Sequence, residues 1–426
     1  MPDQSPEIEN AVGHLFRHQA GKMVAVLTRI FGSHNIALAE DVVQDTLLTA
    51  LEQWKLKGIP KDAEAWLFIV AKNKALNLIK KQKSNVLFGD EITQPLLQSG
   101  YTVETTINQL FEENLIKDDQ LRMMFACCHP ELSEESQITL ILKTLCGFST
   151  AEIAKAFLTS EDTVSKRLYR TKEFFRENKI QLTIPNVDEI KKRTNAVLNS
   201  IYLIFNEGYN STNSEELIRK DVIEESVILC KLLADNEHTQ LPEVFALMAL
   251  MCFHASRSDS RLSAEGEIIL LPMQDRSIWN RVLITEGSNF MDKAAFGNVI
   301  STYHLQAGIA FEHCIAPSFE KTNWHKILSY YQWLCRIAST PVTELNRIII
   351  VFQLQGAAVA LKELEAIEHK SKLESYYLYY SLLGEIYIKL NDPAIAKKHF
   401  EKAAALTQSK MEQRLLQNKI SSLVHN

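Results

Sequence analysis

The stretch that decides the fold is TLCGFSTAEIAKAFLTSEDTVSKRLYRTK, residues 144–172. Gly147 is typical of the end of one helix, and Ser149 or Thr150, followed closely by Glu152, is typical of the start of the next. A three-residue turn then leads to Ser160, which is positioned to cap a longer helix. A short helix, a tight turn and a longer helix in this order predict a helix-turn-helix motif.

The longer helix of this motif has two distinct faces. Val164, Leu168 and Phe175 share the spacing of an inward-facing stripe. In a helix-turn-helix the second helix lies in the major groove, where its outer side chains contact bases and phosphates. The predicted DNA-contacting residues are Ser160, Glu161, Asp162, Thr163, Ser165, Lys166, Arg167 and Arg170. A helical hairpin with a merely solvated charged face is the alternative, and the motif alone does not identify the kind of DNA-binding protein.

The composition around this motif favours an all-α protein of several domains. The chain has 426 residues, of which only 14 are Gly and 11 are Pro, so long stretches run without helix breakers. Its seven Cys form no CxxC pair, so the sequence predicts neither a disulfide framework nor a metal site, and no cofactor. The first residues do not resemble a signal peptide and no apolar run is long enough to span a bilayer, so we expect a cytoplasmic protein.

The net charge of −6 hides local basic segments. Five Lys and no acid lie between Trp66 and Gly89, and a second basic segment runs from Glu161 to Lys179. Because DNA interacts with a local patch of charge, the negative total does not argue against nucleic-acid binding.

The N-terminal part reads as a compact helical unit. We expect helices at residues 8–31, 37–54 and 63–81. Gly58 and Pro60 predict the break between the second and third helices, and Asp62 is placed to cap the third.

Two stretches of this unit carry a family resemblance: AEDVVQDTLLTALEQW, residues 39–54, and AEAWLFIVAKNKALNLIKK, residues 63–81. Together they resemble region 2 of RNA polymerase sigma factors of the extracytoplasmic-function (ECF) type. The helix-turn-helix resembles region 4 of the same family. Both motifs occur in the family's order, so the resemblance implies a sigma factor, which binds core polymerase and directs promoter-specific initiation.

The resemblance also implies roles for particular residues. Asp41, Gln44 and Asp45 lie on one helix face and would meet the clamp helices of the polymerase β′ subunit; from the residues alone they would be a solvated face. The loop at residues 55–61 would hold a flipped base. The helix-turn-helix would contact the −35 element and the β flap. The residues facing the −10 element would be Lys72, Asn73, Asn77, Lys80 and Lys81.

The expected domain organisation has five parts: region 2 at residues 7–83, a linker at 84–118, region 4 at 119–183, a helical extension at 186–300, and repeat-like helices at 301–426. The stretches at residues 204–209, 256–261 and 270–279 resemble an ECF subgroup with a long helical extension. Six charged residues in these parts form either a charged pocket or structural ion pairs. They are Arg257, Asp259, Arg261, Glu265, Asp275 and Arg276.

The last part has the spacing of a tetratricopeptide repeat (TPR), with Gln408 in place of its final Pro. The matching residues are Tyr380, Leu383, Gly384, Tyr387, Ala396, Phe400 and Ala403. A pair of helices near residues 344–364 reads as a degenerate second copy. Stacked units of this kind bind peptides or partner domains, so the extension is predicted to regulate the sigma activity in cis.

Two other functions compete with a sigma factor. A helix-turn-helix regulator that senses a ligand or partner through the extension and never joins polymerase would leave the first unit unexplained. An enzyme in the extension would use His254, Asp259, Asp275 or His304, but no catalytic fingerprint accompanies them, so we expect a protein without enzymatic activity.

Overall fold

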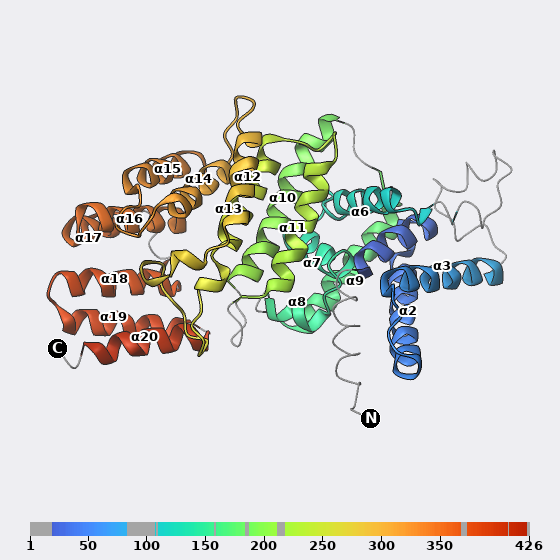
Figure 1. The fold of residues 1–426 in the computed structure, drawn as a ribbon, viewed down its shortest axis with the longest axis horizontal. Coiled ribbons are helices and arrows are strands. Elements are labelled where there is room, and N and C mark those ends of the chain that lie inside the picture. Colours follow the sequence, from blue (N-terminus) through green and yellow to red (C-terminus); the bar gives the residue numbers. More distant parts are fainter. Residues whose placement is uncertain are drawn as a thin grey trace. The chain divides into compact units, whose positions relative to one another are not determined.

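In the computed structural model the chain is helical (Figure 1), which confirms the all-α prediction. The structure describes residues 19–82, 107, 110–156, 159–183, 187–210, 218–367, 373–407 and 409–423. These residues contain no strand, only an isolated bridge between Leu262 and Ile268. None of their helices is long and apolar enough to cross a membrane. The chain divides into two compact units, Met1–Ile204 and Phe205–Asn426.

The first unit begins with a helical core. Helical residues 19–31 are followed by η1 (Ser33–Asn35), α2 (Ile36–Lys57) and α3 (Ala63–Gln82). The helices enclose Met23, Leu27 and Phe31, each fully buried, and Trp54, which meets Trp66 edge-on at a ring distance of 5.4 Å.

Local signals explain where the helices of this core end and begin. Gly58 ends α2 with a φ of 79°, a conformation that favours glycine. The Asp62 carboxylate accepts a hydrogen bond from the Ala65 N–H at 2.8 Å and so starts α3. The break and the cap are as the sequence predicted. The predicted helix at residues 8–31 is described only from residue 19.

The expected linker at residues 84–118 is structured in its last part. Ile107 and Leu110 are buried in the core of the first helices, and Phe111 meets Phe68 edge-on at 6.1 Å. Helix α6 begins at Glu113 and ends at Cys127. Burial of such apolar side chains is favourable. Residues 83–106, 108 and 109 lie outside the described part.

The helix-turn-helix is built from α7 (Glu134–Thr144), α8 (Thr150–Ala156) and α9 (Glu161–Asn178). Before α8, the Glu152 N–H donates to Ser149 Oγ at 3.1 Å and the Ser149 N–H donates back to Glu152 Oε2 at 2.8 Å. This capping box makes Ser149 the cap residue. Phe157 and Leu158, in the predicted turn, lie outside the described residues.

Helix α10 (Val187–Tyr209) crosses the boundary between the two units. Within the first unit its Ser200 hydroxyl lies 3.9 Å from the Cys128 thiol, and Asn199 donates a hydrogen bond to Glu134. The start of the extension therefore packs on the helix-turn-helix domain.

The second unit consists of α-helices and short 3-10 turns. In chain order they are α11 (Lys220–Asp235), α12 (Pro242–Ala255), η2 (Ser258–Ser260), η3 (Leu271–Met273), η4 (Arg276–Ile278), α13 (Arg281–Ala294), α14 (Thr302–Ile315), α15 (Trp324–Ile337), α16 (Pro341–Gln355), α17 (Ala357–Glu365), α18 (Tyr377–Lys389), α19 (Pro393–Leu406) and α20 (Lys410–Ser422). Every residue of α12 from Val244 to Phe253 is buried, so this helix forms the centre of its part of the unit.

The repeat-like segment forms the antiparallel helices α18 and α19, which lie side by side with α20 (Figure 1). A Cβ on Gly384 would lie only 2.5 Å from the Phe400 ring, so glycine is required for this close approach. In the preceding pair, Gly356 separates α16 from α17 with a φ of 86°. Assignment of these pairs as TPR units stays a prediction.

Candidate DNA and polymerase interface

Helix α9 presents its outer face because its inner face is firmly packed. Val164 and Phe175 are fully buried and Leu168 is 6% exposed. The Ser160 hydroxyl accepts the Thr163 N–H at 3.1 Å, which fixes the first turn. The predicted inward stripe is confirmed, and Thr171 extends it.

The predicted DNA-contacting residues of α9 differ in how freely they face solvent. Arg170 is exposed, and Lys166 is exposed while paired with Asp162 at 2.6 Å. Arg167 is half-buried and donates to Thr139 Oγ1 at 3.4 Å, so it also braces α9 on α7. The remaining predicted residues, Ser160, Glu161, Asp162, Thr163 and Ser165, are exposed.

Sequence reasoning missed Tyr169, whose side chain is 67% exposed on α9. It lies between the basic residues Lys166 and Arg170. The sequence did contain a signal for it. Position 169 does not belong to the buried stripe at residues 164, 168, 171 and 175, so its aromatic side chain must lie on the outer face of the helix.

On α3 the predicted −10 residues form an exposed stripe. Asn73, Asn77, Lys80 and Lys81 are exposed at positions i, i+4, i+7 and i+8, which share one helix face. Lys72 is half-buried beside them. Amide groups match base edges and ammonium groups match phosphates, so this face is suited to nucleic acid. One turn earlier, Ile69 is 53% exposed and extends the stripe with an apolar side chain.

The loop at residues 55–61 is open to solvent. Leu56 is 86% exposed and Ile59 is 44% exposed, beside exposed Lys55, Lys57 and Lys61. Exposed apolar side chains next to lysines suit contact with an unstacked base and its phosphates.

The acidic face of α2 also carries an apolar side chain. Asp41, Gln44 and Asp45 are exposed. The apolar side chain of Leu48 is 57% exposed. Position 48 follows 41, 44 and 45 by seven, four and three residues, so Leu48 shares their face. The face therefore combines acidic and amide groups with one apolar side chain.

Two polar contacts connect the region-2-like helices to the helix-turn-helix domain. Lys172 pairs with Glu40 at 2.5 Å, and both side chains are largely buried. Arg29 pairs with Asp119 at 2.9 Å. Burial raises the pKa of Asp119 to about 6, against the opposing charges of Arg29 and Arg122. The two sigma-like parts are therefore packed together in this conformation.

The six charged residues of the extension do not form one pocket. Asp259 pairs with Lys220 at 2.8 Å. Asp275 accepts the Ser277 N–H at 2.8 Å and caps η4, and Glu265 is exposed in the turn beside Ser263. The three acids thus serve local contacts, and none of them forms an ion pair with Arg257, Arg261 or Arg276.

The candidate enzyme residue His304 and the adjacent pair Cys127 and Cys128 have structural surroundings. His304 Nδ1 accepts the Ser301 N–H at 3.1 Å and Nε2 lies 3.1 Å from the Ala294 carbonyl, so this ring holds the start of α14. Cys127 and Cys128 are buried, and burial raises the pKa of the Cys128 thiol to about 12. The described residues contain no group of side chains that could hold a metal ion.

Comparisons with known proteins cover both of these parts of the chain. Residues 15–85 match the family model of sigma-70 region 2, and residues 122–175 match that of sigma-70 region 4. Over 134 residues the chain is 32% identical to the ECF RNA polymerase sigma factor SigL of Mycobacterium tuberculosis, an alignment that covers 31% of this chain and 70% of SigL. The chain belongs to the ECF family of RNA polymerase sigma factors.

The extension of this ECF sigma factor has relatives of its own. Residues 193–295 match a family of unknown function (DUF6596). An uncharacterized protein of Rhizobium meliloti, R00370, is 33% identical over 389 residues, which covers 91% of this chain and 90% of that protein. That relative therefore shares the extension as well as the sigma regions. No solved structure matches the chain.

Proposed function

We propose that this sigma factor binds core RNA polymerase, directs promoter-specific transcription initiation and catalyses no reaction itself. The observation that carries the proposal is the presence of two opposite kinds of exposed helix face on one unit. Asp41, Gln44 and Asp45 on α2 would contact the β′ clamp helices, with Leu48 adding apolar area. The faces of α3 and α9 would contact DNA.

The two DNA faces would have different tasks. The amide and lysine stripe of α3 would meet the −10 element and its separated strand, with the loop at 55–61 beside a flipped base. The first turns of α9 would read base edges of the −35 element, while Lys166 and Arg170 contact phosphates. Arg167 is braced by Thr139 and would add a fixed donor at the groove.

Promoter binding would require the two sigma regions to separate. The −10 and −35 elements are about 25 base pairs apart, which is roughly 85 Å of duplex at 3.4 Å per base pair. The Glu40–Lys172 pair connects helices α2 and α9 directly and cannot persist across that span. Polymerase binding at Asp41, next to Glu40, would supply the free energy for this opening.

Run-off transcription with purified core polymerase and a genomic promoter library tests the proposal. We expect new start sites preceded by shared −35 and −10 elements only when the protein is added. Stable co-purification with core polymerase is also expected. Failure of both would favour the regulator that senses a ligand and never joins polymerase.

We also propose that the extension regulates this activity in cis, through a protein or peptide partner on α16–α20. The buried contact between Cys128 and Ser200 decides how to truncate the chain, because a protein ending at residue 185 would lose α10 and expose the surface it covers. A chain ending at Asn210 keeps α10. Its run-off activity should differ from that of the full chain in at least one growth-phase extract; equal activity in all extracts would contradict regulation by the extension.

A further inference from the structure

Three arginines of the extension gather where the segments after α12 meet α10 and α14. Arg257 and Arg261 flank η2, and Arg276 begins η4. Arg257 donates to the Tyr209 hydroxyl at 2.7 Å, and the Arg261 guanidinium lies 4.0 Å above the Tyr209 ring. Arg257 and Arg276 both lie over the Trp279 ring, at 5.7 and 4.7 Å. Two aromatic rings thus hold all three guanidinium groups.

Among the described residues, acidic side chains compensate these groups only weakly, through the more distant charge of Glu320 on Arg276. In the described part of the chain, none of the three arginines has an ion pair within 4.0 Å. Their partners are neutral: Arg276 donates to the backbone carbonyls of His313 and Ala316. Burial, with the charge of Arg257, lowers the pKa of Arg261 and of Arg276. Like charges held together away from bulk water are unfavourable unless an anion joins them.

The same place contains several buried donors without a hydrogen-bond partner. Trp279 is 2% exposed, and its indole Nε1 has no acceptor. Arg257 Nε and Arg276 Nη2 also lack acceptors. The nearby ring nitrogens His254 Nδ1 and His313 Nδ1 and the hydroxyl Ser258 Oγ, each of which can donate or accept, are likewise unpaired. Buried donors are normally satisfied, so a group of them indicates that an acceptor belongs there.

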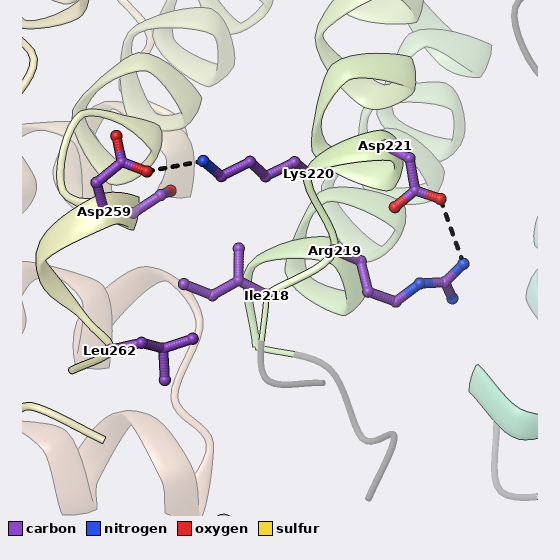
Figure 2. Close-up of a pocket in the computed structure, with 7 residues that line it drawn as sticks. Ile218, Arg219, Lys220, Asp221, Asp259 and Leu262 are labelled. Atoms are coloured by element: carbon purple, nitrogen blue, oxygen red, sulfur yellow. Dashed lines mark hydrogen bonds and ion pairs between the residues drawn. The ribbon is translucent and has the colours of Figure 1, made fainter. Parts of the chain in front are cut away.

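The neighbouring hollow is a weaker candidate for an anion site. It has a volume of about 440 Å³ and is lined by Ile218, Arg219, Lys220, Asp221, Ser258, Asp259 and Leu262 (Figure 2). Its charges are already matched, because Lys220 pairs with Asp259 at 2.8 Å and Arg219 pairs with Asp221 at 3.6 Å. The uncompensated positive charge lies with the three arginines.

We propose that Arg257, Arg261 and Arg276 bind the phosphate group of a small ligand. A phosphate carries close to two negative charges at neutral pH and three acceptor oxygens. It would therefore neutralise more of this cluster than a single carboxylate. Guanidinium groups bind such oxygens with paired hydrogen bonds, and the Trp279 indole would donate a further one. The extension would then carry a small-molecule site in addition to any surface for a protein partner.

Inorganic phosphate is a direct probe of the site in the full-length protein. We expect phosphate at ten times its Kd to raise Tm by roughly 3–6 °C relative to chloride at the same ionic strength. Hydrogen exchange should slow in peptides covering residues 254–281. Acetate, which carries one charge, should have a smaller effect. Equal Tm values in phosphate and chloride would overturn the proposal.

Arg257→Met separates an anion site from a structural arginine. Removing one of three repelling charges should raise Tm in chloride and abolish the specific response to phosphate. A purely structural Arg257 would instead lower Tm in both salts. Arg336→Met, an exposed change of the same kind on α15, is the matched control and should retain the full phosphate response. This control also accounts for the general stabilisation that phosphate gives to many proteins. A phosphate response retained by Arg257→Met would reject the site.

Discussion

The positive charges of the two units are held in opposite ways. On α3 and α9, Lys80 and Arg170 are exposed on regular helix faces and stay hydrated until a partner arrives. In the extension, Arg257 and Arg276 are half-buried among aromatic rings and carbonyls. Exposed charge costs little in the free protein and acts mainly in binding, whereas enclosed charge affects stability before any ligand binds. Substitutions in the two units should therefore change different quantities.

The largest effect is expected from reversing charge on α2. Asp41→Lys combined with Asp45→Lys should lower run-off transcription at least about a thousandfold, because like charges would face the polymerase clamp and cost several kcal/mol. Both side chains are exposed, so the free energy of unfolding should change by less than about 0.5 kcal/mol. Asp292→Lys with Glu365→Lys is the control of equal charge change in the extension. Normal transcription by the α2 variant would remove α2 from the polymerase interface.

Acid should destabilise the second unit more than the first. Burial and the nearby arginines lower the pKa of His254 to about 3, and His313 to about 3. The ordinary pKa of histidine is about 6.5. Between pH 3 and pH 6.5 the unfolded state therefore binds about two more protons than the folded state. Stability is fully present above pH 6.5 and is lost as the pH falls toward 3. At pH 5.5 we expect a loss of about 1.4 kcal/mol per histidine, or about 3 kcal/mol together.

Urea denaturation of the full chain at pH 7.5 and 5.5, followed by hydrogen exchange in each unit, measures this loss. The groups facing His254 are Arg257, Arg261, His313 and the Tyr209 ring. His254→Gln should remove about half of the pH dependence. An unfolding free energy of the second unit that is equal at the two pH values would contradict buried neutral imidazoles.

The sequence predicted the features of the first unit better than those of the second. Caps and periodicity are local, so the helix expected at 37–54 was found as Ile36–Lys57, and Val164 and Leu168 face inward as expected. The Asp62 cap was equally readable. The outward position of Leu48 could not be predicted in this way, because it depends on where the core lies, which the residue type does not determine.

The arginine cluster could not be read in the same way. Its residues were noticed, but the sequence left open whether they pair with Asp259 and Asp275 or form a pocket. Their actual neighbours, Tyr209, Trp279 and the carbonyl of His313, come from separate segments of the chain. Only tertiary packing brings such segments together, so no local period or spacing encodes the site.

A smaller effect is expected from the ion pair that joins the two sigma regions. Reversing and then swapping its charges tests whether it stabilises their packing. Lys172→Glu would place a second carboxylate against that of Glu40. The repulsion should weaken the packed state by roughly 1–2 kcal/mol. Hydrogen exchange should speed up in peptides covering residues 33–47 and 165–180. Adding Glu40→Lys restores opposite charges and should restore slow exchange. If the double variant exchanges as fast as Lys172→Glu alone, the pair does not hold the regions together.

The smallest effect is expected at a single exposed lysine of α3. Lys80→Ala should remove about one phosphate contact, so the slope of log affinity against log salt should fall by about 0.7–0.9. Promoter affinity at 0.15 M salt would drop about fivefold. Lys389→Ala, an exposed lysine at the end of α18, should change neither value. The Tm of Lys80→Ala should equal that of the wild type, whereas Arg257→Met should raise it in chloride. A raised Tm for Lys80→Ala would mean that charge on α3 is also strained in the free protein, and the contrast between the two units would then fail.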